Sequence, residues 1–395
     1  MTLWTIIPRD PLIFRDGRPF NADAGARAKS LPFPYPSTIA GAVRTLAGPN
    51  PLTGKFDKIR ITELLSKQIR GPLLVELAES GQIADWLFPA PADALLLKHD
   101  DPIQKEKARR FLCCPLNLPN GTQTSIDKLN KESGIELKIV GLPVPTTGKP
   151  HPKAPHYWKQ DAFEKWLVTP ENKEVTLSDI GHNGPLAESR MHVGVNKETG
   201  TGIPGALFQT SGLEFMQRER EEKEPYPKLK DVKTLGLALE TDTSLDKGLG
   251  FLGGERRVAQ WMKTEDVLPK CPNEVRKNIL EQGACRLILL TPAYFKDGYL
   301  PTWLQEQYNI KIVGAAVPRY KVVSGWDYQI RKPKPTRRLA SAGSVYFIKV
   351  KQNVENFIDA IWMRSISDGN QNRLDGFGLA VLGTWNGELQ DMEVN

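Results

Sequence analysis

The glycine-rich segment KGLGFLGGERRVA is the first place where residue types and spacing could do chemistry. It contains the pattern G-x-G-x-x-G at Gly248, Gly250 and Gly253, which in dinucleotide-binding proteins brings backbone amides against a pyrophosphate. That fingerprint follows a strand directly and opens a helix. Here the polar residues TDTSLDK separate it from the preceding apolar run, and the charge of Glu255 would repel a phosphate. A nucleotide-dependent enzyme is therefore the least favoured alternative.

The same glycines suit a different phosphate-containing ligand. A residue without a Cβ atom lets the backbone approach a ligand closely, and guanidinium groups form paired hydrogen bonds to phosphate. We predict that Gly253, Gly254, Arg256 and Arg257 bind RNA. The structural alternative is a glycine-rich turn in which one arginine pairs with Glu255.

A second glycine pair, Gly376 and Gly378, lies between an expected helix and the last apolar strand. A tight turn here would expose backbone N–H groups, which can form an anion-binding nest. The simpler alternative is a loop that leads into the strand. From the residues alone, this simpler alternative is favoured.

Several basic clusters lie beside glycine, proline and aromatic residues. Cations follow a phosphate backbone and aromatic rings stack on unpaired bases, whereas the alternative for any one cluster is a solvated loop. The net charge of +7 also favours a polyanionic partner. The predicted RNA contacts in these clusters are Arg15, Arg18, Arg27, Lys29, Lys334, Arg337 and Arg338.

Catalytic and metal-binding patterns are sparse. The five histidines include no H-E-x-x-H, the four cysteines include no C-x-x-C, and no P-loop or G-x-S-x-G occurs. We therefore predict no metal and no cofactor. His192, next to Arg190 in a glycine- and threonine-rich segment, could serve a metal-independent ribonuclease as general acid or base. The alternatives are that it hydrogen-bonds RNA, which we predict for both residues, or packs in a turn.

The length of 395 residues suits about two domains. Apolar periodicity predicts an α+β protein, with Ser37 or Thr38 capping the first helix. The expected strands are 3–7, 71–77, 235–240, 286–291, 310–317, 344–350 and 379–383, and the expected helices are 38–47, 301–308 and 357–366. The N-terminus does not resemble a signal peptide and the cysteines form no disulfide framework, so we expect a cytoplasmic protein.

Six segments, taken together and in this order, resemble one family. They are PRDPLIFRDGRPF, PFPYPSTIAGAVR, ESRMHVGVNKETGTGIPGALF, GFLGGERR, GWDYQIRKPKPTRRLASAGSVYF and GFGLAVLG. They look like the third subunit of the Cmr effector complex of type III-B CRISPR systems, within the RAMP superfamily. The resemblance covers nearly the whole chain, although residues 95–180 contain no motif that contributes to it.

The resemblance implies two ferredoxin-like (RRM-like) domains packed together with long inserted loops, over residues 1–230 and 231–395. It implies a non-catalytic subunit that grips the 5′ tag of the CRISPR RNA in antiviral defence. It also implies that Gly376 and Gly378 belong to a glycine-rich loop that lies against RNA, so we predict both as RNA contacts. Its partners would be the large polymerase/cyclase palm-domain subunit and a backbone RAMP subunit, with target RNA contacted indirectly and no membrane. The alternative within the superfamily is a metal-independent endoribonuclease that processes repeat RNA with His192.

Overall fold

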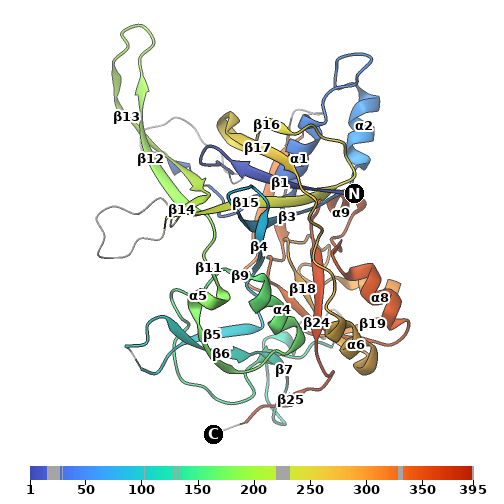
Figure 1. The fold of residues 1–395 in the computed structure, drawn as a ribbon. Coiled ribbons are helices and arrows are strands. Elements are labelled where there is room, and N and C mark those ends of the chain that lie inside the picture. The colour runs from blue at the N-terminus through green and yellow to red at the C-terminus, as the bar shows by residue number, and fades with distance from the viewer. Residues whose placement is uncertain are drawn as a thin grey trace. The chain divides into compact units, whose positions relative to one another are not determined.

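The protein is a mixture of antiparallel sheets and short helices, as the sequence predicts (Figure 1). We describe it from a computed structural model, in residues 1–15, 27–28, 30–101, 103–127, 130, 134, 136–218, 232–327 and 332–393. The predicted contacts Arg18 and Lys29 lie outside these ranges, as does the side chain of Arg27.

The chain forms two compact units, each assembled from three separate stretches. Unit 1 contains Met1–Asp85, Gly184–Val267 and Val322–Arg338, and unit 2 contains Trp86–Asn183, Leu268–Lys321 and Leu339–Asn395. Stretches of unit 1 and unit 2 therefore alternate along the sequence. The expected boundary after residue 230, which concerns two consecutive RAMP domains, stays a prediction.

Unit 1 is built on an antiparallel sheet with strand order β3-β15-β1-β17-β16. The central strand β1 is rich in β-branched and aromatic residues, and its residues 3–6 are buried. β14 adds to β15. The strands are β1 (Thr2–Pro8), β3 (Ile69–Leu77), β14 (Met216–Arg218), β15 (Val232–Thr241), β16 (Gly248–Phe251) and β17 (Val258–Lys263).

Helix α1 (Pro36–Leu46) packs its apolar stripe of Ile39, Ala40 and Val43 against this sheet. The expected serine or threonine cap is wrong, because the helix already begins at Pro36 and Tyr35 occupies the N-cap without a side-chain hydrogen bond. Proline suits a first helical position, since its missing N–H would have no partner there. Helix α2 (Lys58–Ser66) follows and buries only Leu64.

Two ribbons complete unit 1, and the longer of them, β12–β13, is seen in Figure 1. β12 (Leu186–Val195) and β13 (Gly202–Glu214) form an antiparallel hairpin, to which β2 (Arg27–Ala28) adds in parallel. β20 (Lys321–Asp327) pairs with β21 (Lys332–Leu339). A short 3₁₀ turn, η2 (Gly254–Arg256), separates β16 from β17.

Unit 2 contains an antiparallel sheet with strand order β19-β22-β18-β24-β23. All six residues of β18 are buried, as are those of β24. The elements are α6 (Asn273–Gln282), β18 (Ala284–Leu289), α7 (Thr302–Tyr308), β19 (Ile310–Ala316), β22 (Val345–Val350), α8 (Val354–Ile361), β23 (Arg364–Ser365), α9 (Asn370–Leu374) and β24 (Leu379–Thr384).

The two sheets share one strand order. Along the chain, β18, β19, β22 and β24 of unit 2 correspond to β1, β3, β15 and β17 of unit 1, and in both sheets the first strand lies between the third and the fourth. In each sheet a further short strand pairs with the fourth strand: β16 pairs with β17 in unit 1, and β23 pairs with β24 in unit 2. Both glycine-rich motifs occupy the same topological position, directly before the fourth strand. The two units therefore contain sheets of the same topology.

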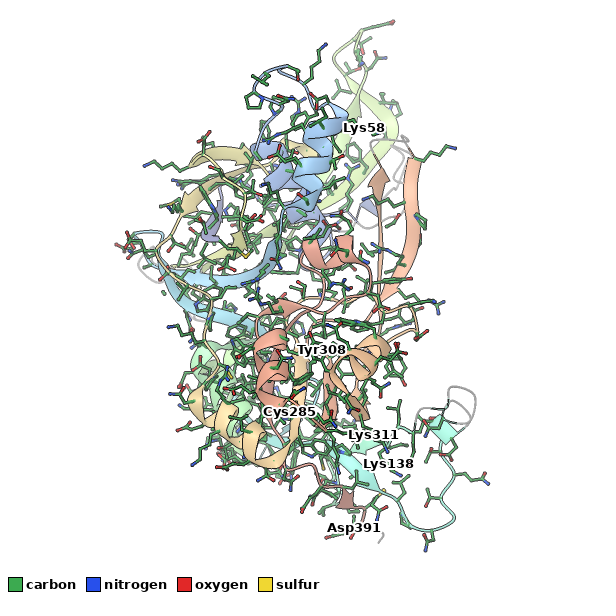
Figure 2. The ribbon with its side chains drawn as sticks, turned by 90° about the vertical axis from the view of Figure 1, so that its right-hand side faces the viewer. Lys58, Lys138, Cys285, Tyr308, Lys311 and Asp391 are labelled. Carbon is green, nitrogen blue, oxygen red and sulfur yellow. The ribbon has the colours of Figure 1, made fainter. Side chains whose placement is uncertain are left out.

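Residues 86–183 supply the rest of unit 2, with β25 from the C-terminal stretch. Next to the pairing of β25 with β7, Asn117 donates a hydrogen bond to Asp391. Lys138 and Lys311 both contact the Glu136 carboxylate, and these contacts lower the pKa of Glu136 (Figure 2). The elements are β4 (Ile83–Pro89), which begins in unit 1, β5 (Ala94–Lys98), β6 (Lys107–Leu112), β7 (Cys114–Asn117), β8 (Val140–Gly141), β9 (Tyr157–Lys159), α4 (Gln160–Val168), β10 (Lys173–Thr176), α5 (Leu177–Ile180), β11 (Gly181–His182) and β25 (Gln390–Asp391).

Candidate nucleic-acid interface

Residues 9–15 bring three of the sequence motifs together in unit 1. Leu12 exchanges two backbone hydrogen bonds with Leu213, at the base of the β12–β13 ribbon. One residue further on, the carbonyl of Ile13 accepts a hydrogen bond of 2.7 Å from the N–H of Gly254. The N-terminal arginine-rich motif, the histidine-containing ribbon and the GFLGGERR turn are therefore neighbours, although they are far apart in sequence.

The G-x-G-x-x-G motif forms a β-hairpin, in which β16 pairs with β17. A dinucleotide fingerprint needs a strand, a turn and a long helix, so this interpretation is wrong. Gly250 is required because a Cβ there would lie 2.6 Å from the Leu46 side chain. Gly253 has φ +81° and its Cβ would lie 2.6 Å from the Ile13 carbonyl oxygen. These two glycines therefore permit close packing between segments of this chain.

The turn holds an exposed arginine in an unusual conformation. Glu255 and Arg256 have φ of 58° and 50°, in the left-handed region, which costs about 1–3 kcal/mol for a residue with a side chain. Glu255 lies 3.0 Å from Arg257 and 3.5 Å from Arg15. The expected pairing of one arginine with Glu255 is thus found for Arg257. Within the described ranges Arg256 has no ion pair, so its guanidinium group is available to an outside anion.

The ribbon positions His192 and Arg190 by contacts within the ribbon itself. His192 Nε2 lies 2.8 Å from the Thr210 hydroxyl oxygen, and its ring stacks on Phe208 with centroids 5.2 Å apart. Arg190 binds both carboxylate oxygens of Glu188, which raises the pKa of that guanidinium. His192 is therefore packed and hydrogen-bonded within strand β12, and not in a turn as one of the alternatives expected.

The second basic ribbon, β20–β21, is hydrogen-bonded to the residue that precedes α1. The Tyr35 hydroxyl donates a hydrogen bond of 3.0 Å to the Val322 carbonyl. Lys334 and Arg338 are exposed and Arg337 is half-buried. These cations belong to unit 1, as do Arg15, Arg190 and Arg256.

The second glycine turn belongs to unit 2 and is buried. The N–H groups of Gly376, Phe377 and Gly378 donate to the carbonyls of residues 373, 372 and 292. In this conformation these amides cannot also form an anion-binding nest, in contrast to the exposed N–H groups that the sequence suggested. A Cβ at Gly378 would lie 2.8 Å from the Ser367 nitrogen, so packing alone requires glycine there.

Comparison with known families gives one match, a profile described as "CRISPR-associated protein (Cas_Cmr3)", which covers residues 4–385. The chain belongs to this family. The predicted resemblance to the third subunit of the type III-B Cmr complex is thereby confirmed. No curated protein matches the sequence significantly.

Solved structures include three similar chains. One is from a cryo-EM structure of the type III-B Cmr-beta bound to cognate target RNA and AMPPnP (19% identity, TM-score 0.44, 91% of this chain and 88% of that chain covered). Another is from Cmr-beta bound to cognate target RNA (18% identity, TM-score 0.44, 90% and 88% covered). The third is from the Csm3–Csm4 subcomplex of a type III-A interference complex (12% identity, TM-score 0.31, 89% and 95% covered).

Sequence reasoning missed two exposed side chains in this Cas_Cmr3 chain. Leu249 and Phe251 on β16 are 70% and 58% exposed. The signal was present in the letters GLGF, because glycine and apolar residues alternate with the period of a strand. The same glycines also match a phosphate-binding pattern, which hides this alternation.

The described residues contain neither a cluster of metal-binding side chains nor a helix suited to cross a membrane. Among them, no group of three or more His, Cys, Asp or Glu side chains is placed to hold a metal ion. None of the helices in the described ranges has the length and apolar character that a membrane crossing requires.

Proposed function

We propose that this Cas_Cmr3 chain is a non-catalytic RNA-binding subunit that grips the 5′ tag of the CRISPR RNA. The observation that carries the proposal is the turn of β16 and β17, where Arg256 is exposed, unpaired among described residues and held with φ of 50°. Strained backbone that presents a free cation is typical of a binding site. Arg15 and Arg257 flank it, so the cluster has a net charge of about +2 after Glu255 is counted.

The contacts of His192 support binding rather than bond cleavage. A general base needs a ring nitrogen within hydrogen-bond reach of the substrate proton that it removes, and one of the two ring nitrogens of His192, Nε2, already contacts the Thr210 hydroxyl. Its stacking on Phe208 gives the ring a packing role in the ribbon. Incubation of the protein with repeat RNA in EDTA tests this point, and cleavage that disappears in His192→Ala would favour the endoribonuclease instead.

Membership of the family supports the wider assignment. We place the chain in a cytoplasmic type III-B effector ribonucleoprotein, where it docks the large palm-domain subunit and a backbone RAMP subunit and meets target RNA indirectly. Both sheets have the strand order of a ferredoxin-like domain, 4-1-3-2 when their four main strands are numbered along the chain. We therefore propose that both units derive from ferredoxin-like RAMP domains, unit 1 having a hairpin in place of the second helix.

The decisive experiment removes the two adjacent arginines. In Arg256→Ala/Arg257→Ala, affinity for tag RNA should fall, and the slope of log affinity against log salt should become shallower by about 0.7 for each phosphate of the single strand that is no longer neutralised. Fluorescence anisotropy with labelled tag RNA measures both quantities. Lys277→Ala, which removes one charge from a side chain 76% exposed on α6, is the charge control. Unchanged affinity in the double variant would refute the assignment.

A further inference from the structure

Strand β16 presents two apolar side chains outward. Successive Cβ atoms of a strand point to opposite faces of the sheet. The Cβ position of Gly250 is directed toward α1, since a Cβ there would lie 2.6 Å from Leu46 Cδ2 and 2.9 Å from Trp261 Nε1. Leu249 and Phe251 therefore project from the opposite face of the sheet. Their exposed fractions of 70% and 58% agree with this direction.

The same face continues onto the neighbouring strands. Phe251 is opposite Val258, and Gln260 is opposite Leu249 on one side and Ile7 on the other. Val258, Gln260 and Ile7 are only partly buried. The guanidinium of Arg9 donates a hydrogen bond to the Gln260 side chain. This is a partly open sheet face with one exposed aromatic ring and a cation at its border.

The charges beside this face favour a nucleic acid as its occupant. An exposed phenyl ring on a monomeric surface is a common docking element for either a protein or an unpaired base. The turn that follows Phe251 holds Arg256 without a described ion pair, and Arg257 and Arg15 share the single carboxylate of Glu255. A single-stranded nucleic acid matches both features at once, because it alternates flat bases with anionic phosphates.

We propose that Phe251 is a stacking platform for an unpaired nucleobase, whose neighbouring phosphate is bound by Arg256. This inference rests on the proposed RNA-binding function and adds a second kind of contact to it. Stacking on an aromatic ring tolerates any base, so the platform orders the strand without selecting its sequence. Open sheet faces that carry aromatic residues bind unpaired RNA bases in the same physical manner.

The test compares variants of Phe251 in the full-length protein. Single-stranded tag RNA with 2-aminopurine at successive positions reports stacking through fluorescence quenching, and anisotropy reports affinity. Phe251→Ala and Phe251→Leu should each weaken binding about 5- to 100-fold and abolish quenching at one position, with an unchanged salt slope. Phe251→Trp should retain both signals. Arg256→Ala should instead make the salt slope shallower by about 0.7.

Leu249→Ala is the matched control, since it removes exposed apolar surface from the same face without removing a ring. Affinity and quenching should stay within about twofold of the wild type. Urea denaturation confirms that each variant is folded. If Phe251→Leu binds and quenches like the wild type while Arg256→Ala weakens binding, the platform is refuted and the proposed function stands. If the wild-type chain shows no salt-dependent RNA binding, both are refuted.

Discussion

At the scale of single residues, each glycine of the G-x-G-x-x-G motif has its own physical cause. Gly248 has φ +147° in open space, Gly250 avoids Leu46, and Gly253 combines φ +81° with an approach to the Ile13 carbonyl. None of these causes is visible in the spacing. A shared spacing with a dinucleotide fingerprint therefore carries little weight unless the flanking elements also agree.

Gly253→Ala should strongly destabilise the protein. With φ +81° and ψ −162°, Gly253 occupies a backbone region essentially restricted to glycine, which costs an alanine about 1–3 kcal/mol. The added Cβ, 2.6 Å from a backbone oxygen, also forces the 9–15 segment to move. We expect the free energy of unfolding in urea to fall by about 2–4 kcal/mol. Gly54→Ala is the control, because Gly54 has φ +64° with nothing within 4 Å. Equal effects of the two substitutions would contradict the role of the close approach.

The arginine pair shows how far the sequence could predict individual site residues. The sequence offered, as the alternative to RNA binding, a turn in which one arginine pairs with Glu255, and Arg257 does so. It could not say which one, because the choice depends on left-handed conformations at Glu255 and Arg256. The turn that contains them contacts the distant segment 9–15, through the hydrogen bond from Gly254 to Ile13 and the ion pair of Glu255 with Arg15. Likewise, the exposure of Phe251 depends on which face α1 covers.

At the scale of elements, local periodicity predicted those with buried apolar stripes. The expected strands at 3–7, 235–240, 344–350 and 379–383 are confirmed as β1, β15, β22 and β24. Helix α2 was missed because only Leu64 of its nine residues is buried, so it has almost no apolar stripe. The long β12–β13 ribbon was missed because both of its faces are largely exposed.

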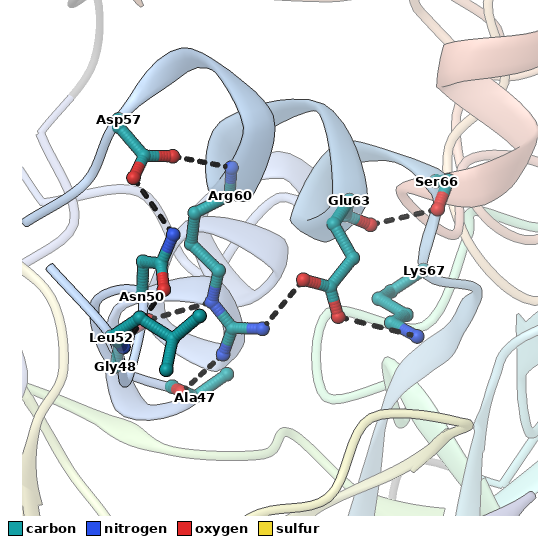
Figure 3. Close-up of polar contacts among 9 residues, drawn as sticks. All are labelled: Ala47, Gly48, Asn50, Leu52, Asp57, Arg60, Glu63, Ser66 and Lys67. Atoms are coloured by element: carbon teal, nitrogen blue, oxygen red, sulfur yellow. Dashed lines mark hydrogen bonds and ion pairs between the residues drawn. The ribbon is translucent and has the colours of Figure 1, made fainter.

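Helix α2 is instead stabilised by polar contacts at its ends (Figure 3). The Asp57 carboxylate accepts a hydrogen bond of 2.8 Å from the backbone N–H of Arg60, which is an N-cap. The Arg60 guanidinium in turn donates to the carbonyls of Ala47 and Gly48 at the end of α1, and it pairs with Glu63. Arg60 thus joins the start of α2 to the end of α1.

The Asp57 cap makes stability depend on pH in a defined direction. The Arg60 N–H and the Thr53 hydroxyl hold the pKa of Asp57 below its ordinary value of 3.8. A lowered folded pKa stabilises the protein above the ordinary value, and this contribution is lost as pH falls through the folded pKa. Asp57→Ala should therefore lower the unfolding free energy at pH 7, and the difference from wild type should shrink below about pH 4.

Asp57→Ser separates the cap from the charge. Serine still accepts a hydrogen bond at an N-cap, but it does not titrate. Its unfolding free energy at pH 7 should lie between those of the wild type and Asp57→Ala, and its deficit relative to wild type should also diminish in acid. A pH-independent difference between wild type and Asp57→Ala in urea titrations from pH 3 to 7 would argue against the cap.

At the scale of the whole molecule, the alternating stretches of the two units were beyond sequence reasoning. Periodicity gives strands and their order along the chain, but strand pairing is set by contacts between distant residues. β1 pairs with β15, more than two hundred residues away. The middle of the chain had no motif, yet residues 86–183 supply a large part of unit 2. The family resemblance covered nearly the whole chain, but the domain boundary that it implied, after residue 230, stays a prediction.

A buried ion pair shows how strongly unit 2 depends on its separate stretches. Arg286 on β18 is fully buried and its guanidinium lies 2.6 Å from the Asp93 carboxylate. The remaining Arg286 donors bind carbonyls of Trp166, Leu167 and Thr384. The Trp166 indole N–H donates to Asp93 as well. Every charge is matched, but by residues that come from three regions of the sequence.

The two halves of the chain should therefore not fold separately. The fragment 231–395 would contain β15 and β17 without β1 and β3, and Arg286 without Asp93. An unpaired buried charge costs about 3–5 kcal/mol, a large part of the stability of a typical domain. We expect no cooperative urea transition, followed by circular dichroism, for this fragment alone, and recovery when fragment 1–230 is co-produced. A sharp two-state transition of the isolated fragment would instead support two consecutive domains with a boundary after residue 230.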